Sequence, residues 1–170
     1  MIAVEELMQA TSKNKIPINY TPEIIQNDIL GKITASTFAL KQPLCAFQDT
    51  KKDCRDCNIW VAVATMKGAV SKINIIAATY PNFPNIYPAF LTLSTPINQF
   101  DCNDLGQSVI RALRVGADNA CQNDVTATSC NGPLPSDPGA YRVRYYLQHP
   151  NGTFLAKTTW SQPIALTKVF

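Results

Sequence analysis

The first residues that could carry chemistry are two cysteines three positions apart. Cys54-Arg55-Asp56-Cys57 is a C-x-x-C motif, which occurs in disulfide-exchange sites and as half of a zinc site. Thioredoxin-type motifs sit between a strand and a helix, whereas this motif precedes an apolar run that predicts a strand. A zinc site needs a second close pair, and the other cysteines are far apart. The motif therefore favours a structural bridge, either within this loop or to other cysteines.

The histidine and the carboxylates offer little further chemistry. His149 is the single histidine and precedes Pro150, which is typical of a solvated turn residue. Asp101 and Asp104, on either side of Cys102, are typical of loops. The chain contains neither a nucleophile elbow nor a glycine-rich phosphate loop. The sequence therefore predicts no enzyme, no cofactor and no metal site.

Composition favours one folded domain. The chain has 170 residues, of which 46% are hydrophobic and 16% charged, which is enough for a single buried core. Its net charge is +3, without the clustered cations that a nucleic-acid surface needs to neutralise several phosphates. No run approaches the ~20 apolar residues that span a bilayer, and residues 1–10 lack the pattern of a signal peptide.

Six cysteines in a chain of this size indicate an oxidising compartment. Cys121 and Cys130 bracket a loop and are predicted to close it, which leaves Cys45 and Cys102 as a long-range pair. The short closure would contribute roughly 2–3 kcal/mol and the long one about 4 kcal/mol. Six cysteines allow 15 connectivities, so this pairing is a hypothesis. We expect a processed or truncated piece of a secreted or membrane-anchored protein.

Two N-glycosylation sequons agree with that compartment. Asn151-Gly152-Thr153 coincides with a predicted hairpin tip, where a glycan would project freely. Asn19-Tyr20-Thr21 is a poorer acceptor because Pro22 follows it. Asn151 and Asn19 are thus the candidate glycosylation sites.

The elements that position these residues are short strands, of which a hairpin over residues 141–160 is the clearest. Alternate residues from Tyr141 to Leu147 share one side of a strand, and His-Pro-Asn-Gly at residues 149–152 predicts a turn into a partner strand. Leu134-Pro135 ahead of Tyr141 matches the tyrosine corner of β-sandwiches, in which the phenol bonds back to upstream backbone.

The position of Trp160 depends on the length of the hairpin loop. A three-residue loop at 150–152 places Trp160 opposite Arg142, where a ring over a guanidinium would contribute ~0.5–1 kcal/mol. A two-residue loop at 151–152 places it opposite Val143, facing the core. Both alternatives stay open, and in either case Trp160 is expected to secure the hairpin.

We predict an all-β fold, a disulfide-stapled antiparallel β-sandwich of the immunoglobulin or fibronectin type III kind with long loops. Strands are expected at residues 33–40, 42–47 along an edge, 59–64, 73–80, 89–93 and 109–115, with a long loop at 121–138. For residues 109–115 a helix is the alternative by propensity, but the β-branched ends and the following Gly116 favour a strand. Residues 1–20 are expected to be a poorly ordered or briefly helical extension, and residues 21–170 a single sandwich domain.

Six short motifs, in order along the chain, resemble the luminal (extracellular) domain of the uroplakin III family, nearest to its uroplakin IIIb and IIIb-like members. They are Tyr20-Thr21-Pro22, residues 31–40 (GKITASTFAL), residues 42–47 (QPLCAF), Leu113-Arg114-Val115-Gly116, Cys130-Asn131-Gly132-Pro133-Leu134, and the closing pair Tyr141-Arg142-Val143 and residues 160–164 (WSQPI). The family's four cysteines match Cys45, Cys102, Cys121 and Cys130. Cys54 and Cys57 depart from the family pattern, which favours a local bridge between them.

The resemblance implies a single-pass glycoprotein on the extracellular face of the apical plasma membrane. It also implies that the ectodomain pairs with the tetraspanin uroplakin Ib and assembles into the plaques that form the urothelial permeability barrier. Such a domain needs exposed apolar surface, for which Phe83, Ile86 and Tyr87 are the candidate residues. Alternatively, those side chains pack into the chain's own core.

Two other functions are weighed beside this one. A soluble receptor-like or adhesion module would bind its ligand through loops at one end of the sandwich, with Asn151 central, and a glycan there would block it. A cytosolic thiol protein would use Cys54 and Cys57 as free thiols.

Overall fold

The computed structural model describes residues 15–26, 29–51, 54–70, 80, 83–100, 102, 112–124 and 129–168. In chain order the elements are β1 (Ile16–Ile18), β2 (Phe38–Lys41), α2 (Gln48–Lys51), β3 (Asn58–Thr65), η1 (Gly68–Val70), β4 (Ala89–Pro96), η3 (Ile97–Gln99), β5 (Ala112–Val115), β6 (Ala140–Gln148), β7 (Phe154–Thr158) and β8 (Ile164–Ala165).

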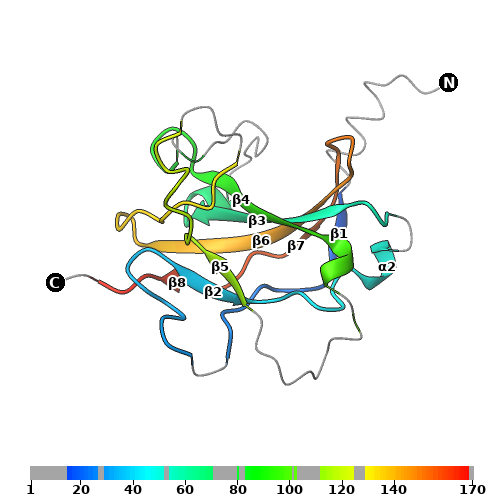
Figure 1. The fold of residues 1–170 in the computed structure, drawn as a ribbon, viewed down its shortest axis with the longest axis horizontal. Helices are drawn as coiled ribbons and strands as arrows, with labels where there is room; N and C mark the ends of the chain where they lie inside the picture. Colours follow the sequence, from blue (N-terminus) through cyan, green and yellow to red (C-terminus); the bar gives the residue numbers. More distant parts are fainter. Residues whose placement is uncertain are drawn as a thin grey trace.

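Two sheets form the two layers of the domain (Figure 1). The large sheet has the order β1-β7-β6-β3-β4, and β8 also pairs with β6. The small sheet consists of β2 and β5, which pair antiparallel. This arrangement and the three disulfides described below confirm the predicted all-β, disulfide-stapled sandwich.

Strands β3 and β6 form the centre of the large sheet, and their sequences explain why. Alternate residues of β3 (Ile59, Val61 and Val63) face the main core, while Ala62 and Ala64 are fully buried on the opposite face. An apolar run of this kind suits a strand with neighbours on both sides and cover on both faces. The strand predicted at residues 59–64 is confirmed and lies between β4 and β6.

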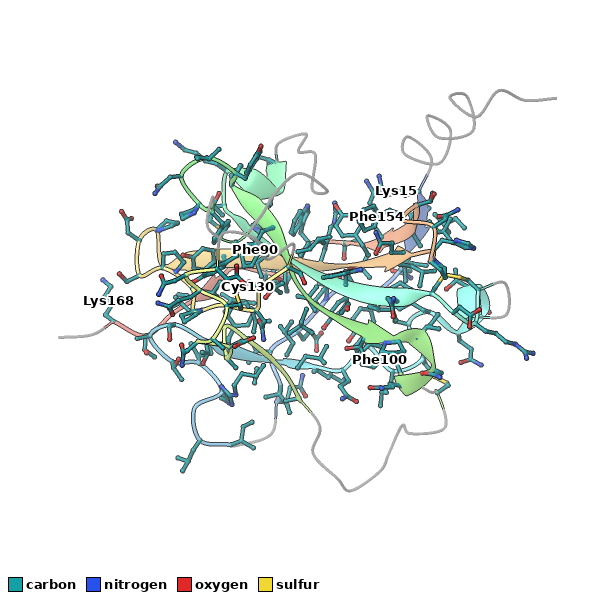
Figure 2. The ribbon with its side chains drawn as sticks, turned by 45° about the horizontal axis from the view of Figure 1, so that its top comes forward. Lys15, Phe90, Phe100, Cys130, Phe154 and Lys168 are labelled. Atoms are coloured by element: carbon teal, nitrogen blue, oxygen red, sulfur yellow. A yellow bond between two sulfur atoms is a disulfide. The ribbon has the colours of Figure 1, made fainter. Side chains whose placement is uncertain are left out.

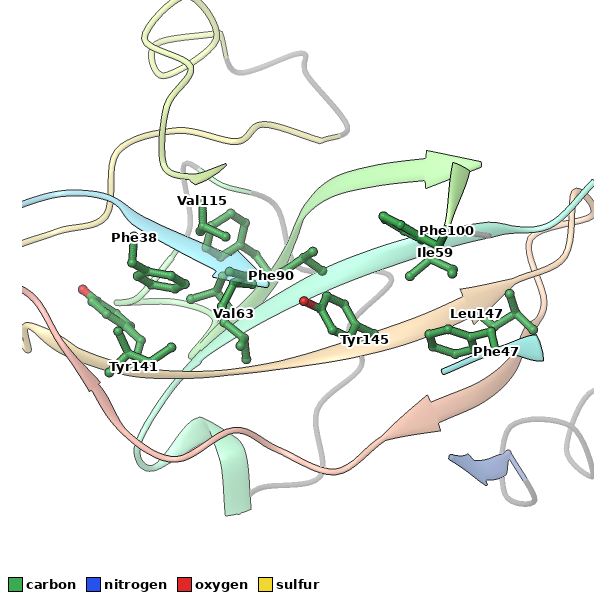
Figure 3. Packing of buried hydrophobic residues seen from close by; sticks show 14 of the residues in the cluster. Phe38, Phe47, Ile59, Val63, Phe90, Phe100, Val115, Tyr141, Tyr145 and Leu147 are labelled. Carbon is green, nitrogen blue, oxygen red and sulfur yellow. The ribbon is translucent and has the colours of Figure 1, made fainter. Parts of the chain in front are cut away.

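The main core lies between the two sheets (Figure 3). The alternating residues predicted to share one side of β6 all face it and are at most 1% exposed. Phe38 of β2, Phe90 of β4 and Val115 of β5 meet them from the other elements. Each such side chain contributes about 1.5–3 kcal/mol when it is removed from water, so this layer is the main source of stability.

The expected strand at residues 33–40 is shorter than predicted. Only Phe38–Lys41 form β2, because the Thr34 hydroxyl accepts hydrogen bonds from the N–H groups of Ser36 (3.2 Å) and Thr37 (2.9 Å). This side chain to backbone bonding competes with a strand and makes a turn. The expected edge strand at 42–47 was also wrong, since residues 44–47 turn into α2 and Cys45 has a φ of 68°.

The start of the sandwich also differs from the prediction. Residues 1–14 lie outside the described part, but Ile16–Ile18 form β1 and pair in parallel with β7. The sheet therefore begins before residue 21, where the extension was expected to end. The strand predicted at 73–80 lies outside the described residues except for Tyr80. For the strand predicted at 109–115, residues 112–115 are confirmed as β5.

Two side chains hold strands and loops together by hydrogen bonds, and the first of them connects the two layers. Asn131 Oδ1 accepts from Thr92 Oγ1 of β4 (2.6 Å) and from the N–H of Gly116 after β5 (2.8 Å), while its Nδ2 donates to the carbonyl of Arg114 on β5 (2.9 Å). The fully buried Tyr141 donates its O–H to the carbonyl of Pro135 (2.5 Å), which confirms the predicted tyrosine corner. Burial raises the pKa of Tyr141 to about 12, so it remains a donor at physiological pH.

We expect Asn131→Asp to destabilise the fold by about 2–3 kcal/mol. The carboxylate would present an acceptor to the Arg114 carbonyl in place of the Nδ2 donor. Denaturant unfolding measures the loss, and Asn85→Asp at an exposed position is the matched control. Equal stability of the two variants would contradict the role of Asn131.

Tyr141→Phe should cost about 1–3 kcal/mol, because the Pro135 carbonyl loses its donor while the ring volume is unchanged. Thermal unfolding is the measurement. Tyr146→Phe serves as the control, since no hydrogen bond of the Tyr146 hydroxyl is found among the described residues. An equal effect of both substitutions would mean that ring packing, and not the corner bond, is measured.

Candidate partner-binding surfaces

All six cysteines are paired. The bridges are Cys45–Cys102, Cys54–Cys57 and Cys121–Cys130, the same pairs that the sequence suggested. Cys54 is 7% exposed and Cys57 1%, so the bridge between them is closed to an attacking thiolate. The free-thiol hypothesis is therefore wrong for this structure. Among the described residues no group of three or more histidine, cysteine or acidic side chains could hold a metal ion.

The hairpin resolves the position of Trp160 in a way that neither alternative predicted. The loop has three residues, because the N–H of His149 donates to the carbonyl of Thr153 (2.8 Å). The register then shifts at a bulge: Gln148 pairs with Phe154, but Leu147 pairs with Ala156. Both alternatives assumed an unbroken ladder. Trp160 follows the end of β7 and lies on the outer face of the large sheet, the face turned away from the small sheet. There the Arg144 guanidinium is 4.4 Å from its ring centroid. Of the two alternatives, the three-residue loop and the stacking on an arginine are found, but the arginine is Arg144, two positions along β6 from Arg142.

The two sequons lie at exposed positions. Asn151 is exposed at the hairpin tip, and its Oδ1 accepts from the N–H of Thr153 (2.9 Å). Asn19 is exposed just after β1, and the hydroxyl of Thr21 forms a hydrogen bond with that of Thr159 (2.8 Å). Glycosylation at either residue remains a prediction.

The loop expected to bind a partner is divided between core and surface. The Phe83 ring lies 4.6 Å from that of Phe90 and 5.7 Å from that of Tyr141, in the main core. Phe83 as a partner contact was therefore wrong, because its side chain completes the fold. Tyr87 is half-buried against the same core, and Ile86 is 68% exposed.

Ile86 stands beside a shallow pocket at one end of the sandwich, which we call the end pocket. Among the residues that line it, Met66, Pro84, Pro88 and Pro138 supply apolar surface, and Lys67 and Asp137 carry opposite charges. The exposed Met66 and Ile86 make the end pocket an exposed apolar region next to the loop that was expected to bind a partner.

A second surface escaped the sequence analysis. The outer face of the large sheet carries a small cluster around Tyr146 and Phe154, apart from the main core. We name its charged and aromatic part the arginine face: Trp60, Arg142, Arg144, Tyr146, Lys157 and Trp160. Figure 2 labels Phe154, which belongs to this cluster. The sequence contained a signal for this surface, because the residues of β6 that alternate with the buried ones are Arg142, Arg144, Tyr146 and Gln148.

No protein-family model matches the chain. It is 34% identical over 154 residues to mouse uroplakin-3b-like protein 1 and 34% identical over 158 residues to human uroplakin-3b-like protein 1. The bovine uroplakin-3b-like protein 1 is 30% identical over 152 residues. Each alignment covers 88% of this chain.

The chain belongs to the uroplakin III family. This bears out the resemblance drawn from the six sequence motifs. The aligned region covers 59% of the mouse protein and 54% of the human one, so the chain spans a little over half the length of these uroplakin-3b-like relatives. Within the described residues, no helix is long and apolar enough to cross a membrane.

Expression through the secretory pathway should place a glycan on Asn151, which stands free at the hairpin tip. Digestion with an N-glycosidase should then increase gel mobility, and Asn151→Gln should remove that shift. Asn19→Gln is the control, with a smaller expected effect because Pro22 weakens its sequon. An unglycosylated Asn151 in secreted protein would contradict the prediction.

Proposed function

We propose that this chain is a non-enzymatic ectodomain of an apical membrane glycoprotein. In this role it pairs with a tetraspanin of the uroplakin Ib type, reaches the luminal face of the plasma membrane through the secretory pathway, and helps to assemble urothelial-type plaques that limit permeability. The observation that carries the proposal is the homology to uroplakin-3b-like proteins over 88% of the chain. The three disulfides support an oxidising route to the cell surface.

The structure favours this role over a soluble receptor-like or adhesion module. Such a module would use the hairpin tip, but the tip carries the sequon at Asn151, and a glycan there would cover it. The end pocket combines apolar lining with the exposed Met66 and the neighbouring Ile86. We propose that this region contacts neighbouring pairs during lateral assembly, because an exposed isoleucine beside proline-lined apolar surface suits a protein contact.

The pairing is tested by expressing the protein in epithelial cells with and without uroplakin Ib. We expect the tetraspanin to raise the amount at the cell surface at least several-fold and to be captured with the protein. Surface biotinylation and reciprocal capture measure the two quantities. Equal surface delivery without the tetraspanin, with no capture, would reject the proposed function.

Ile86→Ser should reduce lateral clustering of the pairs while leaving pairing and folding unchanged, because the side chain is 68% exposed. Cross-linking of surface protein measures clustering. Leu30→Ser provides a matched control, since Leu30 is fully exposed and outside the end pocket. Unchanged clustering of the Ile86 variant would remove this residue from the assembly contact.

A further inference from the structure

The outer face of the large sheet is the starting observation. The small sheet covers the inner face, and within the described ranges no second sheet lies over the residues of the arginine face (Figure 1). Trp60, Trp160, Arg142, Arg144 and Lys157 are partly exposed on it. The small residues beneath, such as Ala62 and Ala64, are fully buried. Side chains on this face are therefore well supported and still accessible.

Three positive charges lie on this face. Arg142 and Arg144 are two residues apart on β6, which separates their Cα atoms by about 7 Å, and Lys157 pairs with Tyr146 on the next strand. No ion pair to these three side chains is found among the described residues, and Arg142 Nε is buried without a hydrogen-bond partner. Burial first, and then the positive charges of Lys157 and Arg144, lower the pKa of Lys15.

Aromatic rings interleave with the charges. The Arg144 guanidinium is 4.4 Å from the Trp160 ring centroid and 5.7 Å from that of Tyr146. Tryptophan, tyrosine and arginine are the residues that most often dominate the binding energy of protein interfaces. The rigid rings lose little conformational entropy on binding, and Arg144 is already held by stacking.

The neutral hydrogen-bonding groups of Trp60 and Gln148 on this face are occupied, and so is Arg144 Nε. Trp60 Nε1 donates to Gln148 Oε1 (2.7 Å), Gln148 Nε2 donates to the carbonyl of Gly152 (3.1 Å), and Arg144 Nε donates to the carbonyl of Thr158 (3.1 Å). A sugar chain needs many free donors and acceptors for its hydroxyl groups. The face offers positive charge and flat apolar rings instead, which suits a protein surface that brings carboxylates.

We propose that the arginine face is the docking surface for an acidic protein partner, and that carboxylates of this partner pair with Arg142, Arg144 and Lys157. Arginine presents a planar fork that matches a carboxylate. The inference rests on the proposed function, since the partner in question is the tetraspanin ectodomain. It places the pairing contact on the outer sheet face, apart from the end pocket and the lateral contact.

The test is reciprocal capture of uroplakin Ib with the full protein co-expressed in epithelial cells. Arg142→Glu combined with Lys157→Glu should lower the captured tetraspanin at least tenfold, because two attractions become repulsions. The matched control, Arg55→Glu combined with Lys168→Glu, makes the same charge change at exposed positions away from the face and should pair normally. Wild-type capture should also weaken between 50 and 500 mM salt.

The outcomes separate the two levels of the proposal. Absence of wild-type capture rejects the proposed function, whereas normal capture of both double variants rejects the arginine face alone. Equal loss in both double variants would mean that net charge matters and not this surface, which also overturns the inference. Removal of anionic cell-surface glycans should have no effect; loss of capture on that treatment would assign the face to a glycan.

Folding is controlled separately. The melting temperature of each secreted variant should stay within a few degrees of wild type, because Arg142 and Lys157 are partly exposed. If the glutamate variant is unstable, Arg142→Gln combined with Lys157→Gln removes the attraction without repulsion and should lower capture about threefold to tenfold. Normal capture by a stable glutamine variant would overturn the inference.

Discussion

Besides the bond from the Tyr145 hydroxyl of β6 to the Lys41 carbonyl of β2, the two sheets are connected by the side chain of Asn131. Its amide accepts from β4 of the large sheet and from the backbone that follows β5, and it donates to the backbone of β5 itself. The Asn131 carbonyl also accepts from the N–H of Asp118, and the adjacent Cys130 is bonded to Cys121. One side chain thus satisfies groups on both layers, where the edge of a two-stranded sheet would otherwise leave backbone polar groups without partners. The backbone approach is also close, since a Cβ at Gly116 (φ 93°) would lie 2.4 Å from the Ser36 carbonyl oxygen.

One neighbour of β6 in the large sheet is an interrupted strand, which consists of β7 and β8. Both β7 and β8 pair with β6, and residues 159–163 connect them. Ser161 bridges the interruption, because its N–H donates to the Val143 carbonyl (2.7 Å) and its hydroxyl accepts from the Val143 N–H (2.9 Å). The ladder's hydrogen bonds are thereby preserved although the strand is not. The irregular segment turns Trp160 onto the outer face, where it meets Arg144.

What the sequence predicts well are features of one strand and its immediate neighbours. Three features follow from residue type and spacing, and the structure confirms them: the alternation of buried residues along β6, the buried apolar residues of β3, and the tyrosine corner. Features that depend on distant contacts were missed. Leu155 gives no local signal of the bulge beside it, and Phe83 lies in a loop with no periodicity to indicate burial. Pro17 argues against a strand, yet β1 forms at an edge where its missing N–H is tolerated.

The arginine face also explains how this fold keeps aromatic side chains at a surface. A six-stranded sheet covered on one side by two strands leaves apolar area exposed on the other, and large exposed apolar patches promote aggregation. Stacking of Arg144 over Trp160, with Tyr146 nearby, covers the rings while keeping a charge in contact with water. A hydrophobic cover such as leucine would pack as well but would not repel other copies of the domain. The positive charges therefore keep the face soluble while it is free, and the same charges leave it suited to a surface of opposite sign.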